Sequence, residues 1–142
     1  RASPNFASFD LTSLKAISGG GAAMPQAVAQ RLLDVYGLKY AEGYGLTETA
    51  APSHQNPLEH PKQQCLGIPF MSTEARVVDP ETLKELAQGE TGEIVVCGPQ
   101  VFSGYWKRPD ATAEVFLSVT SSANAKCDKG VSIMYLAIEM QR

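Results

Sequence analysis

The sequence predicts an α/β layer followed by a small antiparallel β subdomain. The first observation is a strand, a glycine loop, a helix and a second strand in succession over residues 14–41, an order that builds an α/β sheet. The second is two short apolar strands over residues 73–78 and 93–97, with turn residues between them. A chain of 142 residues is long enough to bury a core without disulfides or metals.

The α/β layer is predicted to begin with the short apolar run Leu14–Ser18, which ends at three successive glycines. Pro25 suits the first turn of a helix, and Gly37 is a natural stop. Between them, apolar residues recur with helical spacing at Val28, Leu32, Val35 and Tyr36. Leu38–Ala41 is then expected to form the second strand.

A polar connection rich in Pro, Gln, His and Asn is expected over residues 51–64. After the two β strands, Pro109 predicts a short helix that reaches about Phe116. Residues 118–142 fit neither a strand nor a helix cleanly, so we expect a poorly packed tail there. The expected divisions are therefore residues 1–64, residues 65–117 and this tail.

Composition excludes several classes of partner. Twelve basic against 15 acidic residues give a net charge of −3, which offers no electrostatic footprint for nucleic acid. No stretch approaches the roughly 20 apolar residues of a membrane span. The three cysteines form no C-x-x-C pair, so we expect neither a zinc site nor a disulfide framework, and a reducing, cytoplasmic compartment.

The loop Ser18–Pro25 places three glycines and two alanines directly after a strand. A planar or phosphorylated ligand could reach the backbone of such a loop without obstruction by side chains. The loop matches neither G-x-G-x-x-G nor the P-loop pattern. A plain turn between strand and helix is the alternative.

The stretch EGYGLTETAA, residues 42–51, carries the groups that a nucleotide needs. Tyr44 offers a flat face to a base, Gly43 and Gly45 allow close backbone approach, and Thr47 offers a hydroxyl to a phosphate. Glu48 could hold Mg²⁺ together with phosphate oxygens. The alternatives are a half-buried core aromatic at Tyr44 and a solvated charge at Glu48.

Other chemically capable side chains are expected to be structural. His54 and His60 lie in the polar connection without a paired carboxylate at a telling spacing. Tyr105 and Trp106 are expected to pack the β subdomain against the α/β layer. The charged residues that follow are expected to form a solvated helix start: Lys107, Arg108 and Asp110.

The motif EGYGLTETA, preceded by SGGGAAMP and followed by GEIVVCGPQVFSGYWKRPDAT, resembles the adenylate-forming superfamily of acyl-CoA synthetases, luciferases and peptide-synthetase adenylation domains. The resemblance covers about residues 14–117. GYGLTET together with GYWKRPDAT is most similar to the fatty-acid and aryl acyl-CoA ligases. The resemblance implies a part of the large N-terminal domain of such an enzyme.

The resemblance also implies a role for each motif residue. The backbone of Gly21, Ala22 and Ala23 would border the adenine and the acyl-adenylate. The rest of the ATP/AMP site would be lined by Glu42, Gly43, Tyr44, Gly45, Leu46 and Thr47. Tyr44 would stack on adenine, Thr47 would bond the α-phosphate, and Glu48 would coordinate Mg²⁺, so the catalytic roles fall to Thr47 and Glu48.

The implied activity is that of an AMP-forming acid–thiol ligase, which joins a carboxylic acid, a fatty acid by first choice, to coenzyme A at the expense of ATP. The family's lysine-bearing phosphate loop and its later Thr-Gly-Asp segment do not occur in the 142 residues. We therefore expect an internal piece that works with the rest of a parent chain and does not complete adenylation alone. The alternative is a non-catalytic module that binds a nucleotide or a partner.

Overall fold

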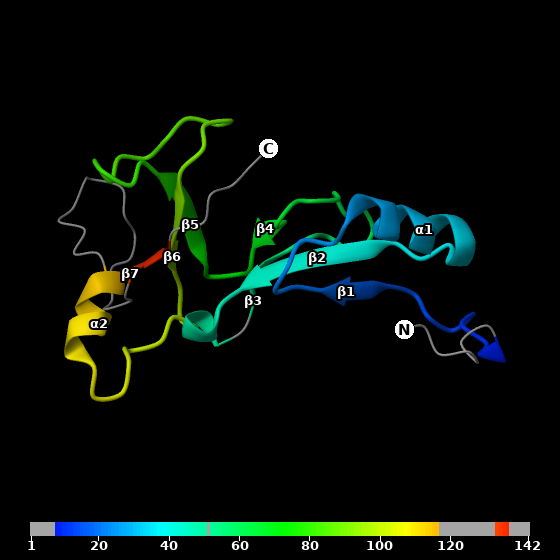
Figure 1. Cartoon of the computed structure of the whole chain (residues 1–142), viewed down its shortest axis with the longest axis horizontal. Coiled ribbons are helices and arrows are strands. Elements are labelled where there is room, and N and C mark those ends of the chain that lie inside the picture. The colour runs from blue at the N-terminus through cyan, green and yellow to red at the C-terminus, as the bar shows by residue number, and fades with distance from the viewer. Residues whose placement is uncertain (1–7, 51, 117–132, 137–142) are drawn as a thin grey trace. The chain divides into compact units, whose positions relative to one another are not determined.

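The computed structural model describes residues 8–50, 52–116 and 133–136. The chain divides into two compact units (Figure 1). The first comprises Arg1–Tyr44 and His54–Ile68, and the second comprises Gly45–Ser53 and Pro69–Arg142. These units are defined by packing, and the domain bounds expected from the sequence stay predictions.

The first unit is built on a strand–helix–strand element. Strand β1 (Ile17–Gly19) leads into helix α1 (Gln26–Tyr36), and the chain returns in strand β2 (Tyr40–Gly45). The two strands pair in parallel, with Ile17 opposite Tyr40. A parallel pair needs a crossover connection, which α1 supplies. The predicted α/β layer is therefore confirmed, although β1 begins three residues later than the apolar run Leu14–Ser18.

Helix α1 ends as its sequence predicts. Gly37 adopts φ 66°, and its N–H bonds the carbonyl oxygens of Leu32 and Leu33, which satisfies carbonyls that the helix leaves without partners. The residues with helical spacing do not all face the core, however. Val28 and Val35 are 46% and 59% exposed, and the buried residue of the helix is Ala29.

The expected polar connection over residues 51–64 is wrong at its start. Residues Pro52–Gln55 form strand β3, and the sheet continues to β4 (Ile68–Pro69) in the order β1-β2-β3-β4. Ser53 and His54 are buried on β3. The polar side chains of β3 gave no strand signal in the sequence, because strand formation here depends on the neighbouring backbone and not on an apolar pattern.

The second unit contains a three-stranded antiparallel sheet in the order β5-β6-β7. Strand β5 (Glu74–Val78) pairs with β6 (Glu93–Cys97), and Val78 lies opposite Glu93. Val78 and the run Ile94–Cys97 are buried, so the core of this unit lies on the central strand. The predicted antiparallel subdomain is confirmed.

The turn that follows β5 is fixed by Asp79. Its Oδ1 accepts hydrogen bonds from the backbone N–H groups of Glu81 and Thr82 and from the Thr82 hydroxyl. These bonds lower the pKa of the Asp79 carboxyl. The turn predicted from these residues is therefore present, and the Asp79 side chain accepts the hydrogen bonds of the backbone N–H groups in it.

The expected poorly packed tail is wrong over four residues. Ile133–Leu136 form strand β7, which pairs antiparallel with β6. The remaining residues of that expectation lie outside the described ranges. A short apolar run without periodicity can form a strand, and no pattern in the sequence indicates which strand it would join.

The predicted short helix is α2 (Pro109–Val115), with proline in its first turn. Cys65 is a free thiol, whereas Cys97 is disulfide-bonded. The expectation of no disulfide is wrong at Cys97, because pairing depends on the distance between Cα atoms in the fold and not on spacing in the sequence. No helix among the described residues is long and apolar enough to cross a membrane.

Candidate functional site

The glycine loop of the first unit presents its backbone to solvent. The loop follows β1, and Gly21 adopts φ +87°, a conformation that favours glycine. Gly21, Ala22 and Ala23 are all exposed, and none carries a side chain larger than a methyl group. A flat ligand can therefore lie directly on this backbone.

The same loop approaches β2 closely. A Cβ atom at Gly20 would overlap the carbonyl oxygen of Gly43. A Cβ atom added at Gly43 would lie 3.5 Å from the carbonyl oxygen of His54. Because residue 20 is glycine, the backbone of the loop can contact the backbone of β2 at Gly43, where any side chain would separate them.

Glu42 on β2 holds the glycine loop in place through hydrogen bonds. Glu42 is 7% exposed, its Oε1 accepts a 2.7 Å hydrogen bond from the Met24 N–H, and its Oε2 accepts a 3.2 Å bond from the Cys65 N–H. Both carboxylate oxygens therefore bind protein backbone. The role expected for Glu42 in lining a nucleotide site stays a prediction, and its contacts show a residue that joins the loop to β2.

Asn56 completes the same network and was missed by sequence reasoning. It is 3% exposed, and its backbone N–H and Nδ2 both donate to the Glu42 carbonyl oxygen. Nδ2 also donates to the Cys65 carbonyl, and Oδ1 accepts from the Lys62 N–H. A single asparagine in a polar stretch carries no sequence pattern that would reveal these partners.

Tyr44 lies at the end of the first unit against His54. Their ring centroids are 5.8 Å apart, with the planes tilted by 55°. Tyr44 is half-buried, which agrees with the alternative of a core aromatic, and stacking on adenine stays a prediction. Burial lowers the pKa of His54, because an apolar environment disfavours the imidazolium.

In the second unit, two threonines of the motif have different surroundings. Residues Thr47–Thr49 form one 3₁₀ turn. The buried Thr49 hydroxyl accepts from the Leu46 N–H at 2.9 Å and donates to the Leu46 carbonyl at 3.0 Å. Thr47 is exposed, and its hydroxyl bonds no other residue in the described part of the chain. Thr49 therefore fixes the turn and Thr47 is available to a ligand.

Glu48, between them, is held by a segment far along the chain. The Tyr105 hydroxyl donates to Glu48 Oε1 at 2.6 Å, and the Phe102 N–H donates to the Glu48 carbonyl at 2.8 Å. The bond to Glu48 raises the pKa of Tyr105. Glu48 is thus not a free solvated charge, and Tyr105, expected to serve packing, has a specific polar partner.

The second carboxylate oxygen of Glu48 suits a hard cation. Within the residues that the structure describes, Oε2 has no hydrogen-bond partner. No group of three or more His, Cys, Asp and Glu side chains in those residues could hold a metal ion. A cation here would therefore need further oxygen ligands from a bound molecule, which is how Mg²⁺ is commonly held by nucleotide enzymes.

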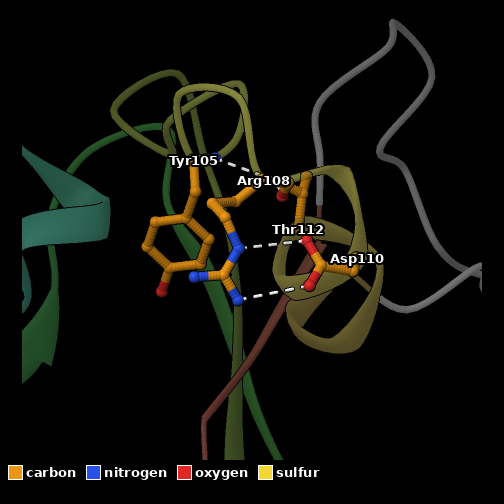
Figure 2. Close-up of polar contacts among 4 residues, drawn as sticks. All are labelled: Tyr105, Arg108, Asp110 and Thr112. Carbon is orange, nitrogen blue, oxygen red and sulfur yellow. Dashed lines mark hydrogen bonds and ion pairs between the residues drawn. The ribbon is translucent and has the colours of Figure 1, made fainter.

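The segment after Tyr105 is polar and exposed, as expected. Arg108 donates from two guanidinium nitrogens to the two oxygens of Asp110, each at 3.2 Å (Figure 2), and this pairing lowers the pKa of Asp110. Trp106 is 86% exposed, with Lys107 Nζ 5.8 Å from its ring centroid. The expected packing of Trp106 against the α/β layer stays a prediction.

Known proteins match most of this chain. A family model described as AMP-binding enzyme matches residues 1–106. The long-chain-fatty-acid–CoA ligase of Salmonella typhimurium is 44% identical over 111 residues, which are 78% of this chain and 20% of that protein. A feruloyl-CoA synthase of an Amycolatopsis species is 42% identical over 116 residues, 80% of this chain and 23% of that protein.

Solved structures agree with these relatives. A long-chain-fatty-acid-CoA ligase from Archaeoglobus fulgidus superposes with a TM-score of 0.74 at 29% identity, over 89% of this chain and 25% of that one. The apo form of MatB from Rhodopseudomonas palustris superposes with a TM-score of 0.68 at 35% identity. The match covers 72% of this chain and 21% of the MatB chain. The chain spans about a fifth of the length of the curated relatives it matches.

Proposed function

This chain belongs to the AMP-binding enzyme family, and we propose on that premise that it is part of an ATP-dependent acyl-CoA synthetase. The parent enzyme would activate a carboxylic acid as acyl-AMP and pass the acyl group to coenzyme A. Because the chain matches about a fifth of its relatives' length, the rest of the parent would supply the remaining parts of the site. The chain alone would not complete adenylation.

One observation carries this proposal: an exposed threonine hydroxyl stands next to a carboxylate with one oxygen that has no hydrogen-bond partner among the described residues. Thr47 and Glu48 share a single turn that Thr49 holds in shape. In the proposed site Thr47 donates to the α-phosphate, where charge builds during transfer. Glu48 would hold Mg²⁺, which when bound would neutralise part of the phosphate charge.

Taken by itself, the first unit offers a surface that would suit the adenosine part of a nucleotide. The exposed backbone of Gly21, Ala22 and Ala23 permits close approach of a planar ring. Tyr44 would stack on that ring. Glu42 would act indirectly, since both of its carboxylate oxygens hold the protein backbone that forms this surface.

The chemistry consists of two displacements. A carboxylate oxygen of the acid attacks the α-phosphorus of ATP, and pyrophosphate leaves with the electrons of the broken P–O bond. The thiol sulfur of coenzyme A then attacks the acyl carbon, loses its proton and expels AMP. No covalent enzyme intermediate is required, so the protein contributes by positioning and by stabilising charge.

A fatty acid is the favoured substrate class. The relatives at 44% and 42% identity include long-chain-fatty-acid–CoA ligases from Salmonella typhimurium and Bacillus subtilis, while a feruloyl-CoA synthase also matches at 42%. An aryl acid is therefore the competing substrate. We further propose a cytoplasmic site of action, with small-molecule substrates and no nucleic-acid partner.

Acid-dependent exchange of labelled pyrophosphate into ATP by the full-length parent tests the proposal. We expect exchange with palmitate and magnesium, and slower exchange with ferulate. Omitting the acid is the matched control and should abolish exchange. Tight ATP binding without exchange for either acid would overturn the proposal and favour a non-catalytic nucleotide-binding module.

A further inference from the structure

We propose that Tyr105 is a positioning residue that orients the Glu48 carboxylate toward the metal–nucleotide complex. The inference rests on the proposed function, because it concerns the carboxylate assigned there to Mg²⁺. Tyr105 itself would not contact the reacting atoms. It would act by holding one oxygen of Glu48 so that the other keeps a fixed direction.

The contact between the two side chains supports this role. The phenol O–H donates to Glu48 Oε1 across 2.6 Å, although the residues are 57 positions apart in the sequence. A bond from a neutral hydroxyl to a carboxylate is stronger than one between neutral groups. The Phe102 N–H holds the backbone carbonyl of Glu48 at 2.8 Å. The same loop therefore fixes both the main chain and the side chain of Glu48.

Ring packing restricts the tyrosine from one side. The Phe102 ring meets the Tyr105 ring edge to face, with centroids 4.8 Å apart and planes at 73°. Phe102 also stacks on Phe116 at 5.5 Å and 25°. Such aromatic pairs favour defined geometries. The phenol ring is 37% exposed and is thus the exposed member of a three-ring cluster, in contact with Phe102.

Backbone contacts restrict the tyrosine from the other side. Figure 2 shows the Thr112 hydroxyl between the two ends of the turn: it accepts from the Tyr105 N–H at 2.9 Å and donates to the Arg108 carbonyl at 2.7 Å. Gly104 adopts φ +134°, and a Cβ there would lie 2.7 Å from Thr112 Cγ2. The turn therefore requires glycine next to the tyrosine that it places.

The consequence for Glu48 is a restricted rotamer. A glutamate loses considerable side-chain freedom when it binds a cation, and a hydrogen bond present before binding reduces that loss. Partners that orient a metal ligand in this way change metal affinity by about 10- to 100-fold when removed. Because one oxygen remains without a partner in the described residues, the bond to Tyr105 leaves a position for the metal.

The test compares Tyr105→Phe, Tyr40→Phe and Glu48→Gln in the full-length parent. Phenylalanine keeps the ring cluster and removes the hydroxyl, and Tyr40→Phe removes a hydroxyl at the start of β2. Mn²⁺ affinity in the presence of ATP is measured by electron paramagnetic resonance, without turnover. We expect Tyr105→Phe to weaken Mn²⁺ binding about tenfold, with the KM for the acid unchanged, and Tyr40→Phe to match the wild type.

The outcomes separate the two proposals. Weaker Mn²⁺ binding in Glu48→Gln with unchanged binding in Tyr105→Phe would overturn the role of Tyr105 and leave the proposed function standing. Unchanged binding in both would overturn the assignment of Glu48 to the metal and the Tyr105 role with it. If Tyr105→Phe does not fold, Thr112→Val provides the second variant, because it frees the turn that places Tyr105. It should weaken Mn²⁺ binding too, and wild-type affinity would contradict the inference.

Discussion

The Glu42 carboxylate lies 2.7 Å from the Met24 amide nitrogen, so a residue of strand β2 holds the loop that precedes helix α1. The other oxygen of the same carboxylate binds the Cys65 amide. Three separated parts of the first unit therefore meet at one buried side chain. The exposed glycine backbone beside it depends on this connection for its shape.

Removing that carboxylate should destabilise the fold. Glu42→Ala leaves the amides of Met24 and Cys65 without their acceptor, and a buried unsatisfied donor costs roughly 1–3 kcal/mol. We expect a decrease of that size in the free energy of unfolding, measured by urea denaturation of this chain. Glu59→Ala is the control, because Glu59 is exposed. Equal, small changes in both variants would contradict the role of Glu42.

Thr49→Ala should affect folding in the same way, since it removes a buried hydroxyl that makes two hydrogen bonds to Leu46. The expected loss is about 1–3 kcal/mol in the free energy of unfolding. Thr47→Ala serves as its matched partner two residues away and should change stability by less than about 0.5 kcal/mol. A larger loss at Thr47 than at Thr49 would reverse the roles that the structure assigns.

Stability should fall as the pH drops from 7 toward 5.5 because of His54. Burial lowers its pKa in the folded chain, so the unfolded chain binds the proton first, and the folded state loses stability below the unfolded pKa of about 6.5. His54→Gln should flatten this slope, while His60→Gln, at an exposed position, should retain it. Urea midpoints at several pH values decide, and identical slopes in all three proteins would contradict the buried neutral histidine.

The hydrogen bond between Tyr105 and Glu48 should be visible in alkaline titration. Glu48 raises the pKa of Tyr105, so the bond stabilises the folded chain below the ordinary tyrosine pKa of about 10 and is lost as the phenol ionises above it. ¹³C NMR of ring-labelled tyrosine should show a pKa of Tyr105 above the ordinary tyrosine value. Glu48→Gln should move the pKa of Tyr105 back toward the ordinary tyrosine value. An unchanged pKa of Tyr105 would argue against its hydrogen bond to Glu48.

Local patterns predicted most of the regular elements. Proline and glycine mark both ends of α1, and alternation marks β5, so these elements follow from the sequence itself. Strand β3 was hidden because its partners, and not its own side chains, make it a strand. The pairing of Ile133–Leu136 with β6 was hidden for the same reason.

The candidate site was also only partly predictable from the sequence. The chemistry of Thr47 and Glu48 could be predicted from residue type and motif. Their surroundings could not, because Tyr105 reaches Glu48 from 57 residues away and the distinction between Thr47 and Thr49 is one of burial. Sequence reasoning names the functional groups, while tertiary contacts decide which of them are available.

The most direct test of the central claim is pyrophosphate release by the full-length parent, measured against magnesium concentration in three variants. Thr91→Ala is the matched control, since Thr91 is exposed, whereas the nearer hydroxyl of Ser53 is fully buried. We expect Thr47→Ala to lower release about a hundredfold at every magnesium concentration. Glu48→Gln should recover part of its activity as magnesium rises, and Thr91→Ala should match the wild type. Equal, mild effects of Thr47→Ala and Thr91→Ala would contradict a phosphate site at Thr47.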